Sequence, residues 1–367
     1  MWRKLQFFFF PHDVHPDHVK SLDGLRGIAV ILVLLSHTSN NNIFFHPALA
    51  FNGIGKGGVY LFFILSAYLL DRQIGYAMMH RQANPWFWKR YFIRRFLRIY
   101  PLFLISLAFY WGITSAGLET VITDGTRFLH HMLMVDGRSV FWSVPVEFKY
   151  YFLSPLILWI CNRYLKWDLR ATALFFLALS GGMMIMDMWL DLDKISTSKY
   201  LVVFLGGTFL ALYNLRLSRP FLAGTGKNLL WILGFMALFL CLFLNPNYVG
   251  DWMGISVSNN GRKIMLIYVG LCMIMLYGAL YDPVYFRKFL EHPVLRVTGV
   301  ISYSLYLFHM PVIYVLREDI LPIPGFLKIY FFIAGTFLLA ICTYGLIERP
   351  LSRIRFSKVP PSGAKAF

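Results

Sequence analysis

Charged residues are scarce in this sequence. Only 14% of its 367 residues are Asp, Glu, Lys or Arg, whereas a soluble domain carries about 25%. Hydrophobic residues make up 58% of the chain. A chain of this composition has too little polar surface to cover itself in water. The shortage of charge therefore argues against a soluble globular fold and predicts an integral membrane protein.

Acidic residues are the scarcer of the two charge types. The chain has 18 Asp and Glu against 35 Lys and Arg, a formal net charge of +17. Such an excess can indicate nucleic-acid binding, but here the basic residues are dispersed between apolar segments. That distribution is typical of a membrane protein held by its cytoplasmic loops. We expect membrane lipids, and no nucleic acid, among its partners.

Cysteines are few, and internal repeats are absent from the sequence. The four cysteines stand singly in or beside apolar runs, without metal or redox spacing, so we expect packing roles and no metal. No low-complexity segment or long linker divides the chain. We therefore expect one membrane domain over 22–350, between a cytoplasmic tail at 1–21 and a basic cytoplasmic tail at 351–367.

What the chain does have is a series of apolar segments near the length of a membrane span. They predict an all-α bundle of about ten transmembrane helices. If both termini are cytoplasmic, the inside segments hold 25 Lys and Arg and the outside segments 9. The predicted spans lie near 24–42, 57–75, 97–116, 142–161, 171–189, 199–214, 229–246, 264–281, 300–317 and 327–347.

The apolar run of the first span begins with Arg26 and closes with His37. Eleven residues are roughly three helical turns, so both side chains lie on one face, about 16 Å apart along the axis. An ionisable residue inside a membrane span is a functional candidate by default. The alternative is that Arg26 reaches lipid headgroups and His37 caps the outer end of the helix.

Two further charged groups break the apolar pattern. Glu147 lies inside the fourth span, where a carboxylate needs a partner on another helix. Arg95 and Arg98 share a helix face at the predicted cytoplasmic mouth of the third span. Two guanidiniums there suit a polyphosphate bound from the cytosol, although an ordinary positive-inside anchor gives the same pattern.

The spans carry motifs that resemble the membrane acyltransferase family 3, which includes bacterial O-antigen, exopolysaccharide and Nod-factor O-acetylases. The motifs occur in the family's order, and Tyr60 stands where many members have an acid. They are LDGLRGIAVILVLLSH (22–37), GVYLFFILSAYLL (58–70), RRFLRIYP (94–101), WSVPVEFKYYFLSPL (142–156), ISYSLYLFHMPVI (301–313) and IERP (347–350).

The resemblance implies an acetyl-CoA-dependent O-acyltransferase of the bacterial cytoplasmic membrane. Its acceptor would be a hydroxyl of a surface or lipid-linked glycan, such as lipopolysaccharide. Arg95 and Arg98 would bind the donor phosphates, and Arg26 would orient the donor or stabilise negative charge. His37 would act as a general base or become acylated itself. Glu147 would hold the second nitrogen of His37 or a cationic partner.

Other histidines are weaker candidates. His309 in the ninth span either lines the acceptor site or makes a structural hydrogen bond. His130 and His131, in a predicted outside loop, are candidates for contact with the acceptor glycan. The spacing of His131 and Asp136 also matches glycerolipid acyltransferases, as does that of His12 and Asp17, but with ten histidines such matches arise by chance.

A second class of function stays open on the sequence. In a transporter or flippase, the same buried charges would form a proton or substrate pathway. The absence of a detectable inverted repeat counts against a transporter, and the cytosolic arginine pair favours the enzyme.

Overall fold

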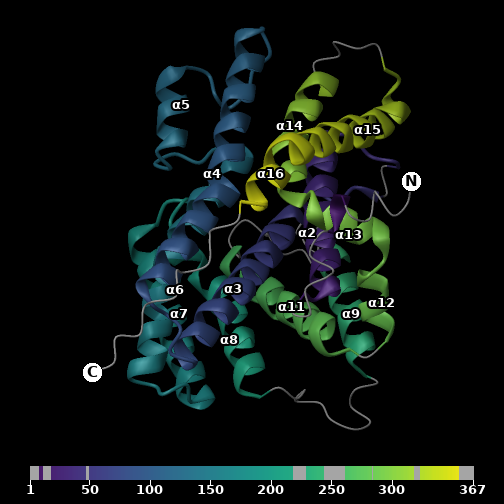
Figure 1. Cartoon of the computed structure of the whole chain (residues 1–367). Helices are drawn as coiled ribbons and strands as arrows, with labels where there is room; N and C mark the ends of the chain where they lie inside the picture. Colours follow the sequence, from purple (N-terminus) through teal and green to yellow (C-terminus); the bar gives the residue numbers. More distant parts are fainter. Residues whose placement is uncertain are drawn as a thin grey trace.

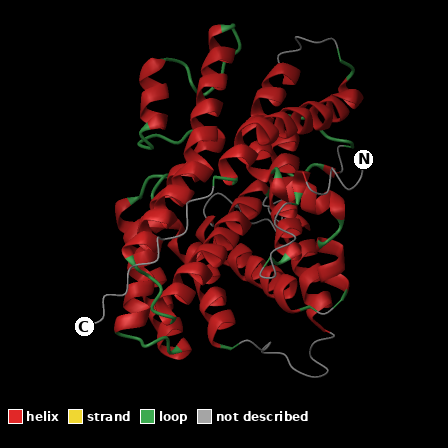
Figure 2. Cartoon of the chain, in the orientation of Figure 1, coloured by secondary structure: helices red, strands yellow, loops and turns green. Residues whose placement is uncertain are grey.

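The fold is described from a computed structural model, which places residues 8–10, 18–46, 49–217, 229–243, 261–282, 284–317 and 323–354. All regular structure in these residues is helical, as the sequence predicts, and they contain no strand (Figure 2). The helices are α2 (Lys20–Asn40), α3 (Gly55–Met79), α4 (Pro85–Ser115), α5 (Gly125–Met132), α6 (Ser143–Arg163), α7 (Leu169–Leu190), α8 (Leu201–Arg216), α9 (Leu230–Phe243), α11 (Gly261–Tyr281), α12 (Tyr285–Leu290), α13 (Pro293–Val300), α14 (Ser302–Arg317), α15 (Gly325–Thr343) and α16 (Arg349–Ser352). Short 3₁₀ turns precede α6 and α8, and a π-helical turn (Tyr344–Glu348) joins α15 to α16.

Seven helices of the described chain are long and apolar enough to span a membrane, or eight if one bent pair counts as a single span. The protein is therefore a multi-pass membrane protein. The expected number of ten spans is not reached by this criterion. Among the expected spans, the second falls outside the seven, and the described part of the seventh, α9, has only 14 residues.

Two connections differ from the predicted loops. The connection between the second and third predicted spans, 76–96, is mostly helical, because α3 continues to Met79 and Asn84 caps α4 by accepting a hydrogen bond from the Phe87 N–H. The segment 282–299 contains α12 and α13. Helix α13 meets α14 at a bend of 78°, so the ninth expected span is the second arm of a broken helix.

Helix α2 packs against both α3 and α13 (Figure 1). Glycines allow α2 and α13 to approach closely, as small residues do between membrane helices. A Cβ added at Gly299 would overlap the carbonyl oxygen of Asp23, and one added at Gly27 would overlap that of Leu295. This contact brings Ser302, at the start of α14, next to Arg26.

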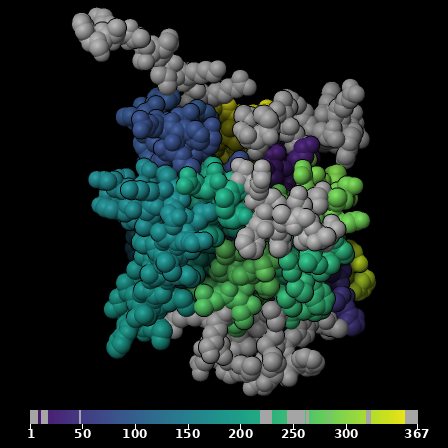
Figure 3. Space-filling model, turned by 90° about the horizontal axis from the view of Figure 1, so that it is seen from below, coloured from purple at the N-terminus to yellow at the C-terminus, as the bar shows by residue number. Residues whose placement is uncertain are grey.

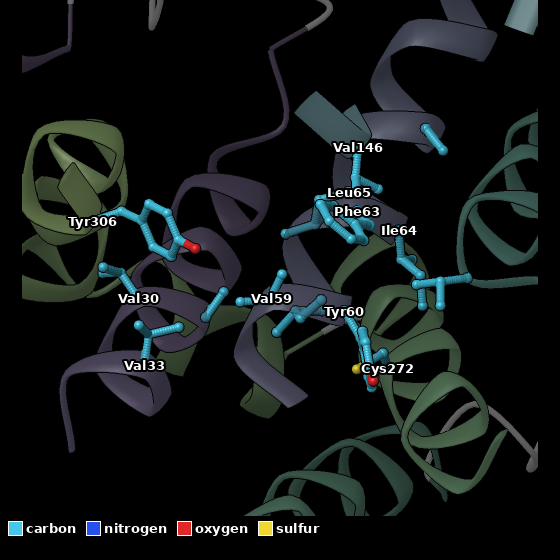
Figure 4. Packing of buried hydrophobic residues seen from close by; sticks show 14 of the residues in the cluster. Val30, Val33, Val59, Tyr60, Phe63, Ile64, Leu65, Val146, Cys272 and Tyr306 are labelled. Carbon is cyan, nitrogen blue, oxygen red and sulfur yellow. The ribbon is translucent and has the colours of Figure 1, made fainter. Parts of the chain in front are cut away.

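The apolar core surrounds α3 on several sides. Figure 4 shows Tyr306 of α14 reaching toward Val30 and Val33 of α2, while Tyr60 of α3 lies beside Cys272 of α11. Seen from below, the teal segments that include α6 to α8 lie next to the green surface of α11 (Figure 3). Helix α3 is thus enclosed by α2, α6, α8 and α11.

Candidate active site

The first sequence-predicted pair lies on one continuous helix, as expected. Arg26 and His37 both belong to α2, with the intervening residues helical and mostly buried. Each lines a different cavity, and a third cavity lies between these two. We call them the arginine cavity, the central cavity and the histidine cavity.

The central cavity is small, with a volume of about 70 Å³. Arg26, Arg95 and Arg98 line it together with Glu147, so the structure brings together four of the candidates that the sequence singles out. Tyr303 and Tyr306 of α14 complete its wall.

Arg26 lies between two helices at the end of this cavity. One Nη atom donates a hydrogen bond to the Ser302 Oγ at 3.3 Å, while the buried Nε has no hydrogen-bond partner among the described residues. A buried guanidinium N–H without a partner is costly. Arg26 therefore retains an unused donor beside the cavity, which suits an anionic or carbonyl group.

The arginine cavity adjoins the central one, and the two share the lining residues Arg26, Leu69, Arg95 and Arg98. The Arg95 guanidinium donates to the Gln73 Oε1 at 3.2 Å and lies 5.8 Å from the ring centroid of Tyr151.

The carboxylates of the arginine cavity have other partners. Asp23 pairs with Arg296 at 3.2 Å and with His18 at 3.3 Å, and Glu348 accepts a hydrogen bond from Ser304. Neither Arg95 nor Arg98 makes an ion pair with a carboxylate of the described chain. Both guanidinium groups are thus available to an anionic ligand.

The histidine cavity lies beyond the other end of the central cavity, and the two share Val59 and Tyr306. His37 lines it, with Trp142 and Tyr200 on the same wall, their ring centroids 5.0 Å apart. Its polar lining is mixed in charge: Lys56, Asp136, Arg138, Asp187, Asp193, Lys194 and Lys199.

The ring of His37 contacts the ring of His309 on α14. The Nδ1 of His37 lies 2.6 Å from the Nε2 of His309, and the two rings are nearly parallel. The Nδ1 of His309 lies 3.1 Å from the carbonyl oxygen of Leu305. Because a carbonyl only accepts, this Nδ1 carries the proton, and in the neutral ring the Nε2 of His309 is then an acceptor. His37 therefore donates from Nδ1 and keeps its lone pair on Nε2.

The side chain of His309 is fully buried and lines none of the described cavities. Its ring contacts His37, as the structural alternative for His309 expects. Sequence reasoning missed this partnership because 272 residues separate the pair. Both residues are polar positions in apolar spans, but that signal does not show which spans meet.

Glu147 takes its hydrogen bonds from hydroxyl groups. Its Oε1 accepts from the Ser66 Oγ at 2.5 Å and from the Tyr151 OH at 2.7 Å. The Nδ1 of His37 is engaged by His309, so Glu147 does not hold it. Neither Ser66 nor Tyr151 was among the candidates, because a hydroxyl in an apolar span gives little sequence signal.

The two histidines expected in an outside loop lie on the short helix α5, and neither lines the described cavities. His131 is fully buried: its Nδ1 donates to the Arg127 carbonyl at 2.8 Å and its Nε2 accepts from the Arg138 N–H at 3.2 Å. Burial lowers the pKa of His131, which favours this neutral ring. His131 makes no hydrogen bond to Asp136, which pairs with Arg138. His130 is exposed and lines none of the described cavities.

Two other points from the sequence concern the spacing of His12 and Asp17 and the question of a metal site. His12 and Asp17 lie outside the described residues. Within the part of the chain that the structure describes, no three His, Cys, Asp or Glu side chains gather as metal ligands would.

Comparison with known families gives one match over nearly the whole chain. A family model described as an acyltransferase domain matches residues 19–345. These residues include every candidate of the three cavities.

Curated relatives are similar over most of this chain. It is 25% identical to the peptidoglycan O-acetyltransferase OatA of Listeria monocytogenes over 378 residues, covering 92% of this chain and 56% of that protein. It is 24% identical to the O-acetyltransferase OatA of Staphylococcus aureus strain NCTC 8325, covering 93% and 58%. The chain thus spans a little over half the length of these relatives. No solved structure matches it.

Proposed function

Since the chain belongs to the membrane acyltransferase family 3, we propose that it is an O-acetyltransferase that uses cytosolic acetyl-CoA and acetylates a hydroxyl of a glycan. The observation that supports this most strongly is the series of three neighbouring cavities, in which the central one shares lining residues with the arginine cavity and with the histidine cavity. A donor that enters from one side and an acceptor that enters from the other would meet along α2.

The arginine cavity suits the donor. Arg95 and Arg98 have guanidinium groups without carboxylate partners, and such groups bind phosphates by charge-assisted hydrogen bonds. Both come from a segment that the Lys and Arg distribution predicts to be cytoplasmic. From there the acyl arm of acetyl-CoA would extend into the central cavity, past Arg26 and Glu147.

The histidine cavity suits the acceptor. Its aromatic wall, Trp142 and Tyr200, offers apolar faces to the C–H faces of sugar rings, and its mixed charges offer hydrogen bonds to hydroxyls. The residues that line it include Lys56, Asp136 and Lys194, all from segments predicted outside. Because two relatives are named O-acetyltransferases, one of them acting on peptidoglycan, an extracytoplasmic glycan is the acceptor class we propose.

His37 would perform the proton transfer. Its Nε2 lone pair takes the proton of the acceptor hydroxyl while that oxygen attacks the thioester carbonyl. The C–S bond then breaks, and the imidazolium returns the proton to the departing thiolate of CoA. Arg26, with its unused N–H, would stabilise the oxyanion or orient the donor. Glu147 would orient the guanidiniums around the central cavity.

An alternative order of steps uses the same atoms. The Nε2 of His37 attacks the thioester first, CoA leaves, and the acyl-histidine passes its acyl group to the glycan. Rapid quenching after mixing with acetyl-CoA alone separates the two orders, because only the second gives acetylated protein without an acceptor.

The proposal is tested with the purified protein in lipid nanodiscs, acetyl-CoA and a panel of N-acetylglucosamine and peptidoglycan oligosaccharides. We expect release of CoA thiol that depends on the acceptor, together with an acceptor heavier by one acetyl group. A protein that moves the oligosaccharide across proteoliposomes and releases no CoA would instead be a transporter, and the proposal would be wrong.

A further inference from the structure

A fourth cavity, which we call the side cavity, opens beside the arginine cavity. It has a volume of about 130 Å³ and is lined by Gln73, Phe87, Arg90, Tyr91, Arg94 and Arg95. The two cavities share Gln73, Arg94 and Arg95. The two cavities are therefore neighbours, with Arg94 and Arg95 facing both.

The lining of the side cavity contains three guanidiniums and no carboxylate. Asp71, the acid nearest in sequence, is fully buried and accepts hydrogen bonds from the hydroxyls of Tyr150, Ser154 and Thr208. It makes no ion pair within the described chain. Guanidiniums that converge in one cavity repel one another, and a bound anion relieves this repulsion.

Two of the three arginines retain unused donors. The Nε atoms of Arg90 and Arg95 are buried and have no hydrogen-bond partner among the described residues. Arg95 is held in place by Gln73 and lies against the rings of Tyr91 and Tyr151, so its orientation is fixed. Fixed guanidiniums with free N–H groups are suited to phosphate.

The positions of the arginines along α4 separate the side cavity from Arg98, which does not line it. Arg90, Arg94 and Arg98 follow one another at four-residue intervals, so they share a face of α4 and cover about 12 Å along its axis. Arg95 lies between them and lines the side, arginine and central cavities alike. The arginines of α4 thus offer two phosphate positions at different depths, one near Arg90 and Arg94 and one near Arg98.

We infer that the side cavity is a second phosphate subsite, in which Arg90 and Arg94 bind a phosphomonoester separate from the phosphates held by Arg98. This rests on the proposed function. In acyl-CoA the separate group is the 3′-phosphate of the ribose, so the subsite would distinguish acyl-CoA from donors that lack it. A phosphomonoester headgroup of a lipid has the same chemistry.

The kinetic test compares acetyl-CoA with 3′-dephospho-acetyl-CoA, for the purified wild type in nanodiscs and for the Arg90→Gln and Arg90→Lys variants. We expect the wild type to favour acetyl-CoA by about tenfold or more in kcat/KM, the effect of one charge-assisted hydrogen bond. In Arg90→Gln this preference collapses, and in Arg90→Lys part of it remains. Lys89→Ala is the matched control, since Lys89 is exposed and lines none of the cavities.

A binding measurement keeps the subsite testable without turnover. By titration calorimetry, adenosine 3′,5′-bisphosphate should bind the wild type about tenfold or more tightly than adenosine 5′-monophosphate, and Arg90→Gln should remove the difference. If no acetyl-CoA is turned over but this difference is found, the proposed function fails and the subsite stands.

Mass spectrometry of the purified protein, in nanodiscs doped with phosphatidic acid, tests whether the phosphomonoester of the side cavity belongs to a lipid headgroup instead of acyl-CoA. Phosphatidic acid retained by the wild type and lost in Arg90→Gln, with no 3′-phosphate preference, assigns the subsite to a lipid headgroup. If neither the nucleotide preference nor the lipid retention responds to Arg90→Gln, the inference is overturned.

Discussion

His37 and His309 meet ring to ring, with the Nδ1 of one 2.6 Å from the Nε2 of the other. The Leu305 carbonyl fixes the proton on the far side of His309, so His37 donates to its neighbour and keeps its Nε2 lone pair. We propose that His309 orients His37 in the way that a carboxylate orients the histidine of a catalytic triad.

The first prediction concerns this orientation. His309→Leu removes the acceptor, so His37 loses its fixed tautomer, and kcat should fall by about 10- to 10³-fold with little change in KM. His309→Gln supplies a carbonyl oxygen that accepts from the Nδ1 of His37, and it should recover part of kcat. Steady-state kinetics on both variants give the answer. Equal losses in the two variants, or a change confined to KM, would show that His309 does not orient His37.

The second prediction concerns the donor phosphates. Arg98→Ala should weaken acetyl-CoA binding by about 1.5–3 kcal/mol, the range for a hydrogen bond to a charged group. Arg98→Lys should restore only part of the affinity, because lysine lacks the forked donor. Arg163→Ala is the control, since Arg163 is exposed at the end of α6 and lines none of the cavities. Titration calorimetry measures the affinities, and an Arg98→Ala affinity equal to the control would leave Arg98 as a lipid anchor.

The helices, and the helix faces on which the candidate arginines lie, could be predicted from the sequence, because hydropathy and helical spacing are local properties. Arg26 and His37 lie on α2 as expected, and Arg95 and Arg98 line one cavity. The contact between His37 and His309 could not be predicted, since it depends on how α2 packs on α14. The burial of His131 could not be predicted either. Its place in a predicted outside loop suggested access to glycan, but both of its ring nitrogens are engaged by backbone groups.

The third prediction concerns the packing of α2 on α13. Gly299→Ala places a methyl group against the Asp23 carbonyl and should destabilise the protein by about 1–3 kcal/mol, the cost of overpacking. Gly112→Ala is the control, because a Cβ there meets nothing within 4 Å. Thermal unfolding in detergent compares the two variants. A melting temperature for Gly299→Ala equal to that of the control would contradict the close approach of these helices.

The fourth prediction concerns pH. Burial lowers the pKa of His131 in the folded protein, so the unfolded chain binds the proton more readily than the folded one. The stability that neutral His131 contributes is complete above its unfolded pKa of about 6.5 and is lost as the pH falls toward the folded value. The free energy of unfolding should therefore fall between pH 7.5 and 5.

The control for this prediction is the neighbouring exposed histidine. His131→Ala should lower stability at pH 7.5 by about 1–3 kcal/mol, because the Arg138 N–H loses its acceptor, and should also flatten the pH dependence. His130→Ala should keep the wild-type profile. A His131→Ala protein whose unfolding keeps the full pH dependence would show that other groups cause it.

The central claim is that the Nε2 of His37 accepts the proton of the attacking hydroxyl, and its most direct test is the transfer rate of two variants at this one position. His37→Ala should insert in the membrane normally and lose at least about 10²–10⁴-fold in acetyl transfer, the range for a general base. His37→Gln keeps hydrogen-bonding capacity but accepts no proton near neutral pH, so it should fail as severely as Ala. Measured as acetyl-glycan formed per minute from acetyl-CoA, both rates should lie together near background. A His37→Gln rate close to that of the wild type would contradict the account and leave the catalytic base to be found among the other residues of the cavities, with Glu147 first.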